Sequence, residues 1–115
     1  MSLPLSPYRR IGGILYLAGE VGRRDGKIVE GGIEHEVTQA LLNIEVTLSR
    51  TGRTLANVVD VTVFLTDMAG DYEIMNETYA RAFNQNKPAR TTVEVRALPL
   101  GARVEFKCIA SAVDY

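Results

Sequence analysis

The chain has 115 residues, of which 46% are hydrophobic and 23% are charged, as in an ordinary globular protein with a single domain spanning residues 1–115. Its net charge of −1 gives no basic field that would attract phosphate backbones or anionic lipid, so nucleic acid and membranes are not expected as partners. With one cysteine, Cys108, and one histidine, His35, the chain has no intrachain disulfide and no Cys/His cluster for zinc.

The first residues predict neither a helix nor a targeting signal. We read Met1-Ser2-Leu3 as a cloning remnant and leave it out of the fold prediction. The start lacks the basic residues and apolar run of a signal peptide, and no window approaches the roughly eighteen apolar residues of a membrane span. We therefore expect a cytoplasmic protein. Residues 4–10 contain Pro4 and Pro7 and predict an extended leading segment.

Two short β elements are predicted next. Gly12-Gly13 forms a turn, and the apolar run Ile14–Ala18 is typical of a strand buried on both faces. Gly19 ends this strand and allows a close approach of the backbone to another group. Residues 21–28 predict a β-hairpin with Asp25-Gly26 at its tip.

The spacing becomes helical over residues 33–50. One stripe is apolar, whereas acidic residues such as Glu34 and Glu36 stay off it. Gly52 supplies a stop signal. The members of the stripe, which we expect to be buried, are Val37, Ala40, Leu41, Ile44 and Leu48.

A strand and a second helix follow. Residues 58–66 predict a strand with one apolar face, formed by Val59, Val61, Val63 and Leu65. Residues 67–70 are interpreted as a break in the structure. The spacing over residues 71–84 then predicts a helix with the stripe Tyr72, Met75, Tyr79 and Phe83.

Residues 88–105 combine strand-like runs with a charge at each end. Pro88 ends the preceding helix and leaves Arg90 at the start of a new strand. A turn at residues 98–101 and alternation over 104–113 complete what we predict as a hairpin or a near-neighbour strand pair.

The predicted order is therefore strand, strand, helix, strand, helix, strand, strand (ββαβαββ). It indicates an α/β (α+β) protein with a mixed sheet and both helices on one face. Residues 104–113 carry apolar side chains on both faces of the predicted strand: Ile109 and Val113 on one face, and Phe106 and Cys108 on the other. One helical layer cannot cover both faces, so we expect a homo-oligomer whose sheets pack together.

The residue types exclude most catalytic templates. The sequence offers no metal set, no Ser-His-Asp set, no glycine-rich phosphate loop, and no cysteine with a histidine nearby. Arg90 could bind a small carboxylate through its planar fork, and Glu105 could activate a water. Arg90 could equally tie a strand end to a neighbouring carboxylate, and Glu105 could belong to a solvated strand face. Cys108 fits a core position.

The motif Pro88-Ala89-Arg90-Thr91-Thr92-Val93-Glu94-Val95, followed by Ala97-Leu98-Pro99, Gly101-Ala102 and Val104-Glu105, closely resembles the signature of the Rid (YjgF-type) family of enamine/imine deaminases, also labelled endoribonuclease L-PSP. Residues 12–20 and 76–79 extend the resemblance over nearly the whole chain. It implies a chorismate-mutase-like fold, a homotrimer with clefts between subunits, and hydrolysis of 2-imino acids to 2-keto acids and ammonia without a cofactor.

The resemblance also implies roles for individual residues. Arg90 would grip the substrate carboxylate, and Glu105 would orient or activate the attacking water. The expected contacts to the substrate come from Gly19, through its backbone, and from Tyr72, Asn76 and Thr92. Thr92 stands where family members often have cysteine or serine.

The chain departs from the family pattern at two places. Leu5 occupies the position of the family's site tyrosine, and Ala18-Gly19-Glu20 replaces Ser-Gly-Gln. Two further hypotheses therefore stay open beside a deaminase. One is a non-catalytic trimer that binds small carboxylates. The other is a ribonuclease, which the near-neutral charge disfavours.

Overall fold

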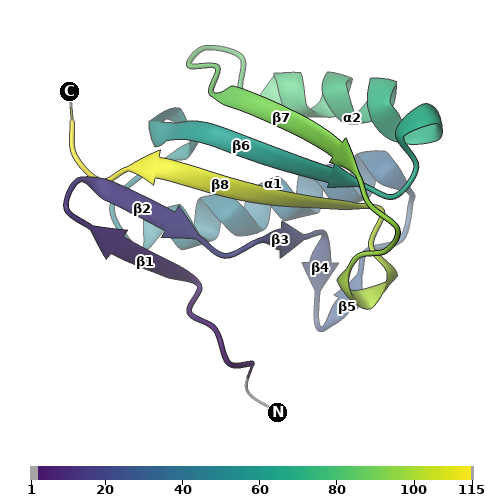
Figure 1. The fold of residues 1–115 in the computed structure, drawn as a ribbon, viewed down its shortest axis with the longest axis horizontal. Coiled ribbons are helices and arrows are strands. Elements are labelled where there is room, and N and C mark those ends of the chain that lie inside the picture. The colour runs from purple at the N-terminus through teal and green to yellow at the C-terminus, as the bar shows by residue number, and fades with distance from the viewer. Residues whose placement is uncertain (1–2, 115) are drawn as a thin grey trace.

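The computed structural model of the protein describes residues 3–114, so Met1 and Ser2 of the expected cloning remnant lie outside the described residues. The main sheet has the order β1-β2-β8-β6-β7, and β3 adds a short pairing to β8 (Figure 1). All its pairings are antiparallel except that of β6 with β7. Its strands are β1 (Tyr8–Ile11), β2 (Ile14–Leu17), β3 (Glu20–Val21), β6 (Val58–Leu65), β7 (Ala89–Glu94) and β8 (Val104–Ser111).

Two helices, α1 (Ile33–Ser49) and α2 (Met68–Ala82), cover one face of this sheet and lie behind it in Figure 1. Every residue of the apolar stripe predicted for α1 is buried. The stripe belongs to one core with alternate residues of β6 and β8, namely Val61, Val63, Leu65, Val104, Phe106 and Cys108. The prediction of a mixed sheet with both helices on one face is confirmed.

The predicted hairpin at residues 21–28 is confirmed. Its arms are β4 (Arg23–Arg24) and β5 (Lys27–Ile28). The tip residues Asp25 and Gly26 have φ angles of 54° and 76°. Positive φ at both central residues is the geometry of a type I′ turn, which Asp-Gly favours.

The strand order predicted from the sequence lacks β1, the first strand of the sheet. Part of the leading segment forms β1, which pairs with β2 from Tyr8 opposite Leu17 to Ile11 opposite Ile14. Gly12 supplies the positive φ, 55°, at the turn between them. The sequence did not predict this edge strand because it has no apolar alternation: Arg9, Arg10 and Ile11 are all exposed.

Helix α2 begins earlier than predicted, and the break expected at residues 67–70 is wrong. Asp67 is the N-cap, because its Oδ1 accepts a hydrogen bond from the Gly70 N–H at 3.1 Å. The Met68 N–H donates to Glu94 Oε1 at 2.9 Å. Two carboxylates thus accept hydrogen bonds from N–H groups at the start of the helix. One of them, Glu94, belongs to the distant strand β7, and sequence periodicity does not reveal its contact with α2.

The stretch from residue 88 to residue 105 is not a hairpin. β7 and β8 both pair with β6, which lies between them, and β7 is parallel to β6. Helix α2 is the crossover that a parallel pair requires. The near-neighbour alternative is therefore correct. The connection to β8 passes the end of β6, where the Thr66 N–H donates to the Arg103 carbonyl at 3.1 Å.

The apolar face predicted for β6 is interrupted at Val59. The pairing with β8 shifts register between Val58 and Asp60, so Val59 bulges out and is 39% exposed. Val61, Val63 and Leu65 keep the predicted face and are fully buried. A bulge adds one residue to a strand and reverses the alternation before it.

Glu36 is buried, although the sequence placed it off the apolar stripe of α1. Its Oε1 accepts a hydrogen bond from the Arg103 N–H at 2.8 Å. Arg103 Nε also lies 3.3 Å from Oδ2 of the buried Asp71. Burial raises the pKa of both carboxyl groups. This cluster joins α1 and α2 to the beginning of β8.

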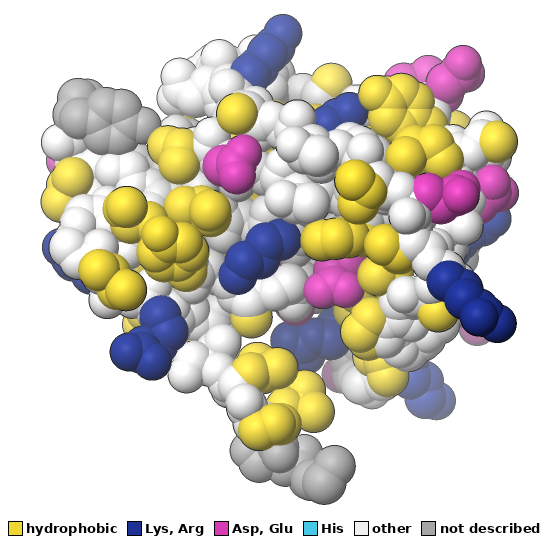
Figure 2. Space-filling view, in the orientation of Figure 1, with side chains coloured by type: hydrophobic (Ala, Val, Ile, Leu, Met, Phe, Trp, Pro, Cys, Tyr) yellow, Lys and Arg dark blue, Asp and Glu magenta, His cyan; other side chains and the backbone are white. Residues whose placement is uncertain are grey.

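The face of the sheet turned away from the helices carries exposed apolar side chains. Strand register places Ile11, Ile14, Tyr16 and Val93 on this open face, and all four are exposed. Figure 2 shows hydrophobic side chains spread across it among a few charged ones. Among the described residues, no helix combines the length and apolar character needed to cross a membrane.

Candidate functional site

Arg90 lies in an open pocket of about 600 Å³ between β7 and α2. Arg90 and Thr92 stand beside the buried Val61 and Val63 of β6, so their side chains point to the helix side of the sheet. Tyr72 of α2 completes the wall, and its Oη accepts a hydrogen bond from Arg90 Nη2 at 3.4 Å. The structure thus brings together three of the predicted site residues, Arg90, Thr92 and Tyr72.

The guanidinium of Arg90 is held by aromatic rings. Its central carbon lies 4.9 Å from the ring centre of Tyr79 and 5.9 Å from that of Tyr72. Glu73 also lines the pocket, but within residues 3–114 no salt bridge involves Arg90. An arginine supported by ring faces keeps its planar N–H groups available for a small anion.

Tyr79 belongs to the predicted stripe of α2 and also supports Arg90. It is only 8% exposed, and its ring centre lies 4.6 Å from that of Phe83. Burial raises the pKa of its phenol to about 12, so Tyr79 stays neutral under Arg90. The seven-residue spacing from Tyr72 to Tyr79, two helical turns, was the signal that both could reach the same side chain.

Glu105 and Gly19 form a second group of predicted site residues. Any side chain at position 19 would collide with Glu105 Oε2, so Gly19 leaves the space that this carboxylate occupies. Burial raises the pKa of Glu105, and no salt bridge reaches it in the part of the chain that the structure describes. A partly buried carboxylate with a raised pKa is suited to accept a proton.

A second pocket, of about 350 Å³, opens beside Gly19. The leading segment forms one wall, because the Ala18 N–H donates to the Pro7 carbonyl at 3.0 Å and brings Leu5 over this edge of the sheet. Glu20 lies in the lining, where Arg23 Nη2 approaches its Oε1 at 3.3 Å. Leu5 is therefore a pocket residue in this chain.

Arg90 and Glu105 lie on opposite faces of the sheet within one chain. Arg90 is level with Val61 of β6, whereas Glu105 is level with Phe64, three positions further along. Side chains alternate between faces, so an odd offset places the two residues on opposite sides. A small molecule cannot touch both groups of a single chain.

Asn76 lines neither pocket. It lies on α2 one turn beyond Tyr72, and its Oδ1 is buried without a hydrogen-bond partner among the described residues. Met75, its neighbour, contacts Arg90 instead of Asn76, with Sδ 4.0 Å from Nη1. The predicted contact from Asn76 to a ligand stays a prediction.

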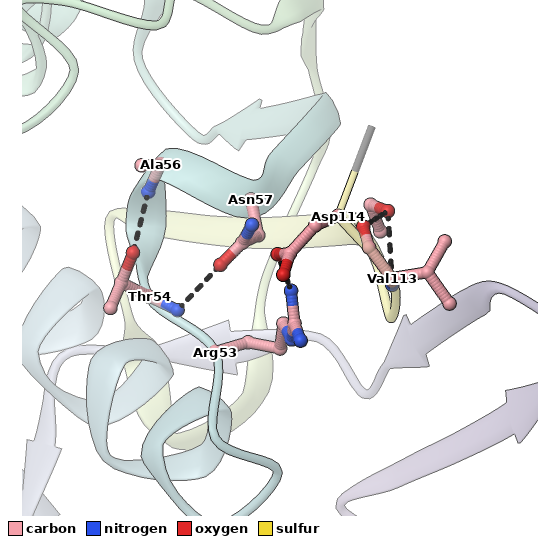
Figure 3. A network of polar contacts seen from close by, with 7 residues as sticks. Arg53, Thr54, Ala56, Asn57, Val113 and Asp114 are labelled. Atoms are coloured by element: carbon pink, nitrogen blue, oxygen red, sulfur yellow. Dashed lines mark hydrogen bonds and ion pairs between the residues drawn. The ribbon is translucent and has the colours of Figure 1, made fainter.

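The opposite end of β6 carries a polar network but none of the predicted site residues. Arg53 Nη1 donates to Asp114 Oδ1 at 2.7 Å, and Thr54 and Asn57 close a short helical turn (Figure 3). The adjoining open pocket of about 620 Å³ is lined by amides, small apolar residues, Lys87 and Asp114. Within residues 3–114, no group of three or more His, Cys, Asp or Glu side chains could hold a metal ion.

Comparison with known families gives one matching model. Residues 2–112 match the family described as Endoribonuclease L-PSP. The match therefore includes the pockets beside Arg90 and Gly19 and every strand and helix from β1 to β8.

Individual relatives agree with this match. The chain is 40% identical over 112 residues to a RutC family protein of Pyrococcus horikoshii, with 93% of this chain and 88% of the relative covered. It is 39% identical over 98 residues to the human 2-iminobutanoate/2-iminopropanoate deaminase, with 84% and 71% covered. A crystal structure of a Rid family protein of unknown function from Yersinia pestis superposes with a TM-score of 0.88 at 39% identity, covering 94% of this chain and 87% of that one.

Proposed function

The chain belongs to the Endoribonuclease L-PSP family, which includes the Rid proteins, and from this premise we propose that it hydrolyses small 2-imino acids to 2-keto acids and ammonia. The human relative is named for this reaction, with iminobutanoate and iminopropanoate as substrates. We further propose that Arg90 and Glu105 are the catalytic residues, with Gly19, Tyr72, Asn76 and Thr92 in contact with the substrate. The reaction as proposed needs no cofactor.

The observation that carries the proposal is the unpaired cation in the pocket between β7 and α2. Arg90 is partly buried, rests on two aromatic rings and has no carboxylate partner among the described residues. A carboxylate bound there in a bidentate manner completes its hydrogen bonding. Every 2-imino acid carries a carboxylate next to the reacting carbon, so binding it also fixes the position of that carbon.

Glu105 supplies the proton transfers of the reaction. Its carboxylate takes a proton from a water as the water oxygen bonds to the imine carbon, and the proton passes to the imine nitrogen. The same carboxylate then takes the hydroxyl proton of the resulting carbinolamine and passes it to the nitrogen. The carbon–nitrogen bond then breaks, and ammonia and the 2-keto acid leave. A buried carboxylate with a raised pKa is a stronger base than an exposed one.

We propose a homotrimer in which Arg90 of one chain faces Glu105 of the next. Two features support it. The two residues lie on opposite faces of the sheet, and the open face carries exposed apolar residues such as Ile14 and Tyr16 that another copy would cover. The cytoplasm stays our prediction for its compartment, since Cys108 is a free thiol.

Competition kinetics test the proposed reaction. An amino-acid oxidase generates 2-iminopropanoate in the presence of semicarbazide, and faster loss of the imine than in buffer is the expected result. Arg90→Ala should lower this activity by at least about a hundredfold, because the carboxylate anchor is lost. The matched control is Arg50→Ala, at the exposed end of α1, which should retain full activity. Equal rates for Arg90→Ala and the unmodified protein contradict the proposal.

A second function is favoured by Leu5, which offers no hydrogen bond where the family has a tyrosine. The trimer would then bind a small carboxylate without turning over an imine. Calorimetry with 2-oxobutanoate separates the two: binding that depends on Arg90 with no imine hydrolysis supports a regulatory binding protein. The net charge of −1 disfavours a ribonuclease. Each of the three pockets described above has a single Lys or Arg in its lining.

A further inference from the structure

Helix α1 binds the two strands that meet at Glu105 through polar side chains, in addition to packing its apolar stripe on the sheet. Val21 of β3 is the register partner of Glu105 of β8. One side chain of α1 reaches each of these two segments, Asn43 on the side of β3 and Glu36 on the side of β8. Hydrogen bonds depend on distance and direction, so they fix the position of a backbone more strictly than apolar contacts do.

Glu36 holds the chain immediately before Glu105. It is only 4% exposed, and its Oε1 accepts a hydrogen bond at 2.8 Å from the N–H of Arg103, two residues before Glu105. The Arg103 carbonyl is bound as well, because it accepts the Thr66 N–H at 3.1 Å. Both backbone polar groups of Arg103 therefore have partners, and β8 begins from a fixed point.

Asn43 holds the partner strand from about two helical turns further along α1. Its Nδ2 donates to the Val21 carbonyl at 3.3 Å and to the Arg23 carbonyl at 2.9 Å. Gly22, between these two residues, lies against the backbone of α1, since a Cβ added there would be 2.5 Å from the Glu36 carbonyl oxygen. The missing side chain of Gly22 thus lets the end of β3 contact α1 directly.

The position of the Glu105 carboxylate depends on this arrangement. Gly19, just before β3, lies so close to it that any side chain there would collide with Oε2. A shift of β3 relative to β8 would therefore displace the carboxylate from the water whose proton it takes. Proton transfer requires hydrogen-bond distance, and a displacement of about 1 Å can lower a rate by about a hundredfold.

We infer that Glu36 and Asn43 are positioning residues for Glu105, which hold β3 and β8 so that its carboxylate lies against Gly19. The expected effect on the rate rests on the proposed function. Neither residue lines the Arg90 pocket, so both should affect the chemical step and not the binding of the substrate carboxylate. A residue that only stabilised the fold would change the free energy of unfolding without this division.

Kinetics of the Glu36 variants test the inference. Glu36→Ala leaves the Arg103 N–H without its acceptor and should lower kcat for 2-iminopropanoate by at least about tenfold. The affinity for 2-oxobutanoate, measured by calorimetry, should stay within about twofold. Glu36→Gln keeps an acceptor oxygen, so its kcat should lie within about threefold of that of the unmodified protein. An unchanged kcat in Glu36→Ala overturns the inference, as does an equal loss in Glu36→Ala and Glu36→Gln.

Two further variants separate positioning from stability. Asn43→Ala should lower kcat by roughly fivefold, and it carries the test if Glu36→Ala does not fold. An unchanged kcat in Asn43→Ala contradicts the role of Asn43. Thr54→Ala is the matched control, because it removes the cap of the short helical turn at the opposite end of β6 and should lower stability without changing kcat. An equal fall of kcat in Thr54→Ala would show that any loss of stability has this effect, and it overturns the inference.

A measurement without substrate keeps the inference apart from the proposed function. If the unmodified protein hydrolyses no imine, the proposed function fails, and the Gly19 N–H resonance in NMR spectra then decides the inference, since Gly19 lies against the Glu105 carboxylate. This resonance should move in Glu36→Ala and stay in place in Glu36→Gln and Thr54→Ala. A Gly19 resonance that does not move in Glu36→Ala overturns the inference.

Discussion

The two residues with proposed catalytic roles differ in what surrounds their charges. Arg90 is stabilised by the faces of Tyr72 and Tyr79, whereas burial works against the charged form of Glu105 and raises its pKa. The two environments suit different tasks. A guanidinium that never loses its charge can anchor a carboxylate at any working pH, and a carboxyl group with a raised pKa exchanges protons more readily.

The pKa of Glu105 predicts the acidic limb of the pH profile. Glu105 must be ionised to act as a base, so kcat/KM should fall as the pH drops through a pKa above the ordinary value of 4.5. Glu105→Gln should remove this limb and lower kcat/KM by about a hundredfold or more. Imine hydrolysis from pH 4 to 8 measures both, and Glu45→Gln, on an exposed position of α1, is the control.

The raised pKa of Glu105 also predicts an effect on stability. This effect distinguishes a catalytic role of Glu105 from a purely structural one. Because the pKa of Glu105 is raised in the folded chain, its contribution is most favourable at low pH and is lost as the pH rises through that pKa. Glu105→Gln should therefore leave the free energy of unfolding at pH 7 unchanged or raise it. Lower stability together with lower activity would indicate that Glu105 mainly supports the fold.

At the scale of the elements, local patterns were predicted well and pairings were not. The stripe of α1 from Val37 to Leu48 and the Asp25-Gly26 turn depend on residues that are near one another in sequence. The parallel pairing of β7 with β6 and the bulge at Val59 depend on contacts between distant segments. Buried Glu36 was missed for the same reason, since its partner is the backbone of Arg103.

The start of α2 shows how one side chain fixes an element boundary. Asp67 accepts a hydrogen bond from the Gly70 N–H. Burial raises the pKa of the nearby Asp71, and the negative charge of Asp67 adds to this effect. Asp67→Ala removes the cap and should lower the free energy of unfolding by about 1 kcal/mol. Asp67→Asn keeps the cap without the negative charge and should cost much less. Urea unfolding of both variants measures the difference, and equal losses would show that the cap does not stabilise α2.

At the scale of the whole molecule, the sequence predicted which residues could form a site. It did not predict that they form two separate groups within one chain. Arg90, Thr92 and Tyr72 share one pocket, while Gly19 and Glu105 lie together on another part of the chain. The irregular connection over residues 95–103 hides the offset between β7 and β8, so spacing alone could not place Arg90 and Glu105 on opposite faces. The apolar alternation of β8 is the sequence signal behind the proposed contact with a second copy.

Complementation between two inactive variants tests whether sites form between chains. When Arg90→Ala and Glu105→Gln chains are refolded together in equal amounts, half of the chains supply an intact Arg90 and the other half supply an intact Glu105. If each site takes Arg90 from one chain and Glu105 from its neighbour, about a quarter of the sites are intact, and about a quarter of the unmodified activity should return. The same variants refolded separately and then mixed are the control for subunit exchange. Because no single chain carries both intact residues, a co-refolded mixture that stays inactive while sedimenting as a trimer would mean that both residues must come from one chain. The positions of Arg90 and Glu105 on opposite faces of the sheet argue for the opposite outcome.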